Sequence, residues 1–114
     1  MKSRGAQAEQ LAAQYLQQQG LSLVERNYRS RFGEIDLIMN DGATLVFIEV
    51  RLRSNADFGG AAASIDAHKQ QRIISTAQQY LSSLARIPPC RFDVLLMDDT
   101  GQRNMNWLRN AFDA

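Results

Sequence analysis

The sequence predicts a single α/β domain in which a mixed β-sheet is flanked by helices. Two segments repeat apolar residues with helical spacing, and short apolar segments typical of strands lie between and after them. The length of 114 residues suits one domain and is enough to bury a core without disulfides or a structural metal. We therefore expect residues 1–114 to form one domain, in the order helix, three strands, helix, two strands.

The first helix is predicted over residues 5–19. Its apolar residues fall on one stripe, and Gly20 ends it because glycine accepts the left-handed conformation found after many helices. A short strand over residues 21–28 follows. The stripe consists of Ala8, Leu11, Ala12, Tyr15 and Leu16.

The next two strands are predicted over residues 33–39 and 44–51, which are rich in Ile, Leu, Val and Phe. Residues 40–43 between them form a hairpin turn centred on Asp41-Gly42, because Asp-Gly tolerates positive φ angles. This turn pairs Asp36 with Phe47 and Glu34 with Glu49.

The second half of the chain is predicted to begin with a surface loop over residues 53–63. Ser64 or Asp66 then caps a helix that continues to residue 85, and Pro88-Pro89 prevents its extension. A strand over residues 90–97, a turn over 98–101 and a last strand over 102–107 follow. We expect a short helical end that carries Leu108, Ala111 and Phe112.

Three acids occur on strands that are otherwise apolar. Strand alternation places Glu34 and Asp36 on the face of Ile38, and Glu49 on the face of Leu45 and Phe47. Neighbouring carboxylates repel one another, and a divalent cation such as Mg²⁺, which prefers oxygen ligands, would reverse that repulsion. Alternatively, this face is solvated and the acids pair with Arg51 and Arg53.

Both helices carry polar residues beside their apolar stripes. Glu9 lies at the edge of the first stripe, and Lys69 and Gln70 lie in line with the apolar residues of the second helix, near its N-terminus. Each is either a functional residue or a solvated flank residue, and Lys69 can also extend its ammonium group to water. His68 lies opposite the second stripe and is expected to be exposed.

From the sequence we expect the protein to be cytoplasmic. No apolar segment is long enough to cross a membrane, and the start of the chain has no signal-peptide pattern. The single cysteine, Cys90, cannot form an internal disulfide and is expected to be a buried, inert thiol. We also expect Trp107 and Phe112 to close the core and Asp93 to pair with an arginine such as Arg91.

The motif Gly33-Glu34-Ile35-Asp36, with Glu49-Val50-Arg51 downstream, resembles the metal-binding signature of the restriction-endonuclease-like nuclease superfamily. The whole chain is similar to the YraN family of small bacterial proteins, which is assigned to that fold. Further matching blocks run in order along the sequence, at residues 5–9, 59–64, 69–70, 91–94 and 107–112.

The resemblance implies an α-β-β-β-α-β core and, by analogy with archaeal Holliday-junction resolvases, a phosphodiesterase site that uses Mg²⁺ or Mn²⁺. It implies that Asp36, Glu49 and Glu9 hold the metal and that Gln70 positions water or phosphate. Glu34 is either a further ligand or a residue that supports the ligands. We expect the substrate to be DNA, in branched or damaged form, and a homodimer would suit an enzyme that cuts two strands.

One position departs from the superfamily pattern. Residue 51 is Arg, where the motif has Lys. Arginine has a pKa above ~12 and cannot act as a base, although it can hold a phosphate or stabilise a transition state. Lys69 would then supply the ammonium group.

Three functions are consistent with the sequence. The first is a metal-dependent nuclease, the second a nucleic-acid-binding module that does not cut, and the third a protein-interaction domain that keeps only the fold. The net charge of +1 does not exclude nucleic acid, because without the four candidate acids the chain has 13 basic and eight acidic residues. The side chains assigned to contact nucleic acid are Arg26, Arg29, Arg31 and Arg53.

Overall fold

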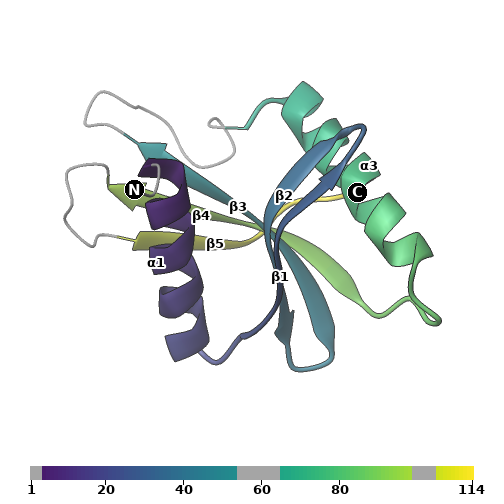
Figure 1. Ribbon diagram of the computed structural model, residues 1–114, viewed down its shortest axis with the longest axis horizontal. Helices are drawn as coiled ribbons and strands as arrows, with labels where there is room; N and C mark the ends of the chain where they lie inside the picture. Colours follow the sequence, from purple (N-terminus) through teal and green to yellow (C-terminus); the bar gives the residue numbers. More distant parts are fainter. Residues whose placement is uncertain (1–3, 54–64, 99–104) are drawn as a thin grey trace.

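The computed structural model describes residues 4–53, 65–98 and 105–114 (Figure 1). Its strands form one five-stranded sheet in the order β1-β2-β3-β4-β5, in which β3 and β4 are parallel and the other neighbours antiparallel. The mixed sheet and the α-β-β-β-α-β order confirm the predicted fold class. The elements are α1 (Arg4–Gln18), β1 (Ser22–Ser30), β2 (Gly33–Asp41), β3 (Thr44–Arg53), α3 (Ala67–Ser82), β4 (Cys90–Asp98) and β5 (Met105–Phe112).

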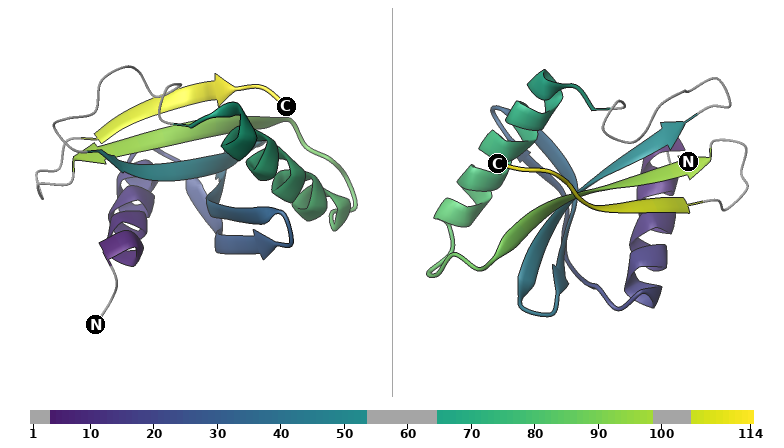
Figure 2. Two further views of the ribbon diagram at one scale, coloured as in Figure 1. Left: turned by 90° about the horizontal axis from the view of Figure 1, so that it is seen from above. Right: turned by 180° about the vertical axis from the view of Figure 1, so that it is seen from behind.

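The helices cover opposite faces of the sheet. Figure 1 shows α1 and α3 on either side of a strongly twisted sheet, and the two views of Figure 2 show the same separation. Ala12 and Leu16 of the predicted α1 stripe are fully buried against residues such as Val46 and Ile48 of β3. Gly20, which ends this helix as predicted, has a φ of 105°.

The α3 face carries the second core. Ile73, Ile74 and Ala77 of α3 pack on Leu45 and Phe47 of β3. Asp66 caps this helix, because its side chain accepts a 2.7 Å hydrogen bond from the backbone N–H of Lys69. The helix ends at Ser82, three residues before the predicted end.

The predicted pairing of β2 with β3 is wrong by two residues. Ile38, rather than Asp36, lies opposite Phe47, and the pairing continues to Asp41 opposite Thr44. The connection is therefore the two residues Gly42 and Ala43, and Gly42 takes the positive φ of 61° that such a tight turn requires. At the other end of the pairing, Leu37 lies opposite Ile48. If this register is continued by one residue, Asp36 is opposite Glu49.

The predicted helical end is also wrong. Leu108, Ala111 and Phe112 belong to strand β5, which pairs with β4 across an irregularity between Phe92 and Val94. Trp107 and Phe112 are half-buried against the core, as expected. The strand forms because β4 offers an unpaired edge, and tertiary pairing overrides the weak helical preference of this short segment.

Asp93 fixes the pairing of these two strands. Its fully buried carboxylate accepts hydrogen bonds from Arg91 Nε at 3.1 Å, Trp107 Nε1 at 2.9 Å and the backbone N–H of Asn110 at 2.9 Å. This confirms the predicted pairing of Asp93 with Arg91. Arg91 also contacts Asp41 at 2.9 Å, which connects the end of β2 to the network.

Two further expectations have opposite outcomes. His68 is exposed, as predicted. Cys90 is also exposed, contrary to prediction, because it lies at the start of β4, where its thiol donates to the carbonyl of Pro88 at 3.1 Å. Arg53 and Asp98, predicted as the first residues of a loop and a turn, are the last residues of β3 and β4. The rest of that loop and turn, and the cap at Ser64, lie outside the described residues. No helix among the described residues has the length and hydropathy needed to cross a membrane.

Candidate metal centre

The site forms where β2 and β3 stop pairing. Asp36 Oδ2 accepts a 2.8 Å hydrogen bond from the backbone N–H of Val50, so a side chain takes the place of a strand partner. Ile35 and Ile38 both pack on the α3 face although they are three residues apart, so the alternation of β2 breaks between them. Asp36 consequently faces α1 and not, as the alternation predicted, the side of Ile38.

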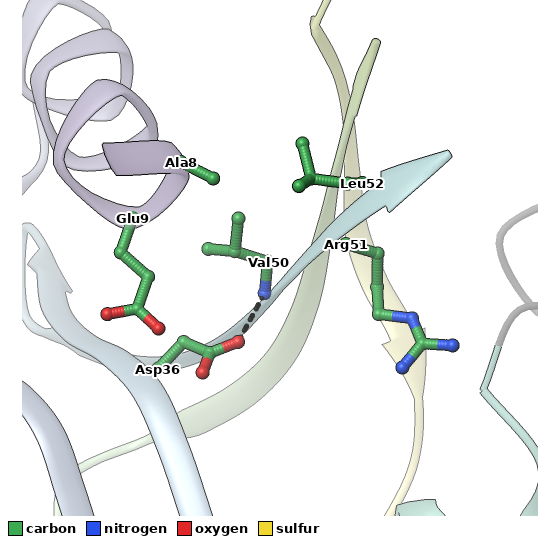
Figure 3. A pocket seen from close by; sticks show the side chains of 6 residues that line it. All are labelled: Ala8, Glu9, Asp36, Val50, Arg51 and Leu52. Carbon is green, nitrogen blue, oxygen red and sulfur yellow. Dashed lines mark hydrogen bonds between the residues drawn. The ribbon is translucent and has the colours of Figure 1, made fainter. Parts of the chain in front are cut away.

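Three carboxylates from two elements converge at this point. Oxygen atoms of Glu9, Glu34 and Asp36 all lie within 4.8 Å of one another. Glu9 comes from α1, where its place beside the apolar stripe aims it at the sheet. A cavity of about 230 Å³ is next to the cluster. Figure 3 shows the Glu9 carboxyl group pointing toward Asp36, whose own carboxyl group is turned toward the Val50 N–H. The residues that line the cavity are Ala8, Glu9, Asp36, Val50, Arg51 and Leu52.

The surroundings favour the protonated forms of Asp36 and Glu9. Burial, followed by the charge of Glu49, raises the pKa of Asp36 to about 7, although the Val50 hydrogen bond opposes the shift. Burial and then the charge of Asp36 raise the pKa of Glu9, while a hydrogen bond with the Asn27 side chain lowers it. When they are ionised, these buried carboxylates repel one another. A bound cation would neutralise that repulsion.

Glu49 lies on the other side of Asp36. It is 6% exposed, and its Oε2 atom is 3.4 Å from the Lys69 ammonium and 3.8 Å from the Arg51 guanidinium. Lys69 lies in the first turn of α3. Because Asp66 caps this turn, the cap also holds the backbone of Lys69 in place. The structure thus brings Lys69, Arg51 and Glu49 together on the α3 face.

Arg51 and Gln70 are held in particular orientations. Figure 3 shows the Arg51 side chain leaving the sheet in a direction away from the carboxyl groups of Glu9 and Asp36. The Gln70 side-chain amide donates to the carbonyl of Ile65 at 3.0 Å, which leaves its side-chain oxygen as an acceptor for a further partner.

The four arginines assigned to nucleic acid are spread over three places. Arg26 is an exposed residue in the middle of β1. Arg29 and Arg31 are exposed near the β1–β2 turn, where Arg29 contacts Glu34 at 3.1 Å. The side chain of Arg53, the last residue of β3, lies outside the described part of the structure.

Sequence reasoning missed two groups that act on the carboxylates. Asn27 has a φ of 54° and hydrogen-bonds with Glu9. The sequence signal was an asparagine within a predicted strand, since asparagine accepts this conformation more readily than most residues. The second group, the backbone N–H of Val50, has no sequence signal because it depends on how the two strands separate.

The donor set fits a hard divalent cation. Carboxylate oxygens in this number are typical of Mg²⁺ and Mn²⁺ sites, which keep water in the remaining positions. Glu9, Glu34 and Asp36 have the spacing needed to share one ion, and Glu49 adjoins Asp36. Such a centre, with two cationic side chains nearby, can bind a phosphate and activate a water molecule.

The fold and the site define an α/β protein with an acidic centre at the point where two central strands separate. A model of the family described as "Uncharacterised protein family UPF0102" matches residues 8–97. The chain belongs to this family, UPF0102 or YraN, which confirms the similarity to the YraN family.

The relatives match nearly the full chain. A UPF0102 protein of Nitrosomonas europaea is 56% identical over 111 residues, covering 97% of this chain and 94% of that protein. UPF0102 proteins of Methylobacillus flagellatus and Nitrosospira multiformis are 53% and 51% identical over 114 residues, covering all of this chain and 100% and 96% of theirs.

Proposed function

We propose that this protein is a Mg²⁺- or Mn²⁺-dependent nuclease that hydrolyses phosphodiester bonds in DNA, with branched DNA as the preferred substrate. The observation that carries the proposal is the position of Asp36. It lies between Glu9 and Glu34 on one side and Glu49, with its two cations, on the other. A centre of this kind places metal ligands and phosphate-binding cations within one site.

Each side chain has a role in this proposal. Asp36, Glu9 and Glu49 hold the metal, and Glu34 completes the oxygen donors or supports them. When bound, the ion neutralises the scissile phosphate and lowers the pKa of its water molecule. Gln70 Oε1 is oriented by the bond from its amide to Ile65 and accepts a hydrogen bond from water.

Lys69 takes the place of the lysine that position 51 lacks. Its ammonium is 3.4 Å from Glu49, closer than the Arg51 guanidinium at 3.8 Å. The lysine ammonium is a compact charge on a flexible stem with three rotatable donors, whereas the arginine guanidinium is planar. Arg51 then stabilises the negative charge that develops on the phosphate, and Lys69 stands beside the ligands.

Carboxylate-to-amide variants test this function directly. Asp36→Asn and Glu49→Gln each remove one charge with little change in size, so we expect folded proteins that no longer cleave a four-way DNA junction with Mg²⁺ or Mn²⁺. Asp113→Asn and Glu25→Gln are matched controls, because both acids are exposed and outside the cluster. Junction cleavage by both site variants at the wild-type rate would refute the assignment.

The same assay separates the alternative functions. Arg51 in place of lysine favours a module that binds nucleic acid without cutting it, and this predicts salt-sensitive binding with no product under either ion. A protein-interaction domain would bind no DNA even at low salt. Nicking that disappears in Asp36→Asn excludes both alternatives.

A further inference from the structure

The tip of the β1–β2 hairpin presents an aromatic ring to solvent. Phe32 is 40% exposed and is the aromatic member among the large apolar side chains that are exposed in the described residues. The Arg31 guanidinium carbon lies 5.0 Å from the centre of its ring. An exposed ring paired with an arginine is the combination that proteins use to stack on nucleic-acid bases.

The tip is held in place by hydrogen bonds that end in the buried core. The Phe32 backbone N–H donates to Ser30 Oγ at 3.0 Å, and Ser30 Oγ lies 2.9 Å from the fully buried Thr76 Oγ1 of α3. The Thr76 hydroxyl also donates to the Arg72 carbonyl at 2.8 Å, and the Ser30 hydroxyl lies 3.4 Å from the Gly33 carbonyl. A ligand that stacks on Phe32 therefore meets a turn that is already ordered, which lowers the entropic cost of binding.

Close packing under the turn supports the same conclusion. A Cβ atom added to Gly33 would lie 3.7 Å from Arg72 Cβ and 3.8 Å from Thr76 Oγ1, so the turn rests on α3. Figure 1 shows the end of this hairpin beside α3.

The turn that carries the ring leads directly into the strand of the candidate metal centre. Glu34, one of the three clustered carboxylates, is the second residue after Phe32 and lies in β2. Arg29, whose side chain is 77% exposed, contacts Glu34 at 3.1 Å. A DNA strand with one phosphate at the metal centre would thus extend past this turn. Arg29 and Arg31 could then bind its neighbouring phosphates.

We propose that Phe32 is a stacking residue that receives an unpaired DNA base beside the phosphodiester bond at the metal centre, an inference that rests on the proposed function. A paired base inside a helix shows only its edges, whereas an unpaired base at a branch, bulge or nick offers a face to the ring. Phe32 then gives the protein its preference for DNA with interrupted pairing.

Fluorescence of an unpaired base tests this role without cleavage. Two short duplexes are titrated in EDTA, one with a single unpaired 2-aminopurine and one fully paired. We expect wild type to quench the unpaired probe and to bind it more tightly than the paired duplex. Phe32→Ala should weaken binding of the unpaired probe by about 5- to 150-fold, the range for losing one stacked base, and abolish the quenching.

Control variants separate stacking from folding and from general apolar contact. Phe32→Tyr keeps an aromatic face and should retain the preference, whereas Phe32→Leu keeps apolar bulk and should lose it. Ile87→Ala, a truncation at a 72% exposed site in another part of the surface, should bind as wild type does. Thermal unfolding of each variant reports on folding.

The outcomes distinguish this inference from the proposed function. Equal binding by wild type and Phe32→Ala, or equal weakening of both duplexes, would overturn the stacking role, whatever the result of the cleavage assay. Loss of the preference in Phe32→Ala supports it even if no variant cleaves DNA. A wild-type protein that binds neither duplex at low salt would overturn the stacking role, whereas the cleavage assay with Mg²⁺ or Mn²⁺ decides the proposed function separately.

Discussion

Asp36 is a buried carboxyl group whose surroundings favour its protonated form. Its pKa of about 7 results first from burial and then from Glu49, and the Val50 N–H compensates only in part. Without a cation, the folded protein therefore holds a proton at Asp36 between about pH 4 and pH 7, where the unfolded chain, with its ordinary pKa of 3.8, has released it. The metal-binding role that we propose for Asp36 is thus linked to a lower stability of the metal-free protein at neutral pH.

The first prediction follows from the sign of this shift. Because the folded pKa is raised, the stabilising contribution of the proton is complete below about pH 4 and is lost as the pH rises toward 7. In EDTA, we expect Asp36→Asn to remove this part of the pH dependence and to unfold at a higher temperature than wild type at pH 8, by about 5 °C or more.

Thermal unfolding followed by circular dichroism from pH 5 to pH 8 measures this effect. Asp113→Asn is the control, since an exposed acid should not alter the slope. Parallel stability curves for wild type and Asp36→Asn would contradict the raised pKa.

At the scale of elements, strand β5 depends on the buried network around Asp93. Its carboxylate accepts from side chains of both strands and from the backbone N–H of Asn110, a residue with a φ of 53° at which β5 departs from regular geometry. Arg91 extends the network to Asp41, at the end of β2. A buried carboxylate is tolerated here because each partner compensates for part of its lost hydration.

The second prediction concerns this network. Asp93→Ala leaves Arg91 and Trp107 without their acceptor, so we expect the free energy of unfolding to fall by about 3 kcal/mol or more. Trp107→Phe removes one hydrogen bond and should cost about 1–3 kcal/mol. Urea denaturation gives both values, and exposed Asn106→Ala on the same strand is the control. An Asp93→Ala protein as stable as wild type would show that the network is dispensable.

At the scale of the whole molecule, a metal-free site concentrates negative charge where three elements meet. Glu9 of α1, Asp36 of β2 and Glu49 of β3 are far apart in sequence, and the fold brings them to one end of the sheet. The remaining residues of the chain are net basic. The near-neutral total charge therefore combines an acidic centre with a basic remainder, an arrangement that suits a metal ion and a polyanion.

The third prediction is that a divalent ion stabilises the native state. At ten times its Kd, a bound ion adds about 1.4 kcal/mol to the free energy of unfolding, which is a rise of several degrees in Tm. We expect this rise for wild type in Mn²⁺ or Mg²⁺, but not for Asp36→Asn or Glu9→Gln. NaCl at equal ionic strength controls for screening. A rise that is the same in wild type and Asp36→Asn would place the ion elsewhere.

The local residue pattern was enough to predict the elements whose apolar residues recur with clear helical or strand spacing. These elements are the α1 stripe, the two central strands and the start of α3, for which Ser64 and Asp66 were the two candidate caps and Asp66 is the one observed. They were predicted because periodicity and capping are properties of neighbouring residues. The end of the chain was predicted as a helix and is a strand. Its few apolar residues fit either structure, and the free edge of β4 decided between them.

The sequence by itself determined the α/β class, the family motif and the candidate residues, because these depend on residue types and spacings along the chain. Only the tertiary structure decided that β2 pairs two residues out of the predicted register and that its alternation breaks before Ile38. It also grouped Glu34 with Glu9 and Asp36, and placed Lys69 beside Glu49. The physical reason is that carboxylates and cations interact through space, so their partners are set by how helices and strands pack.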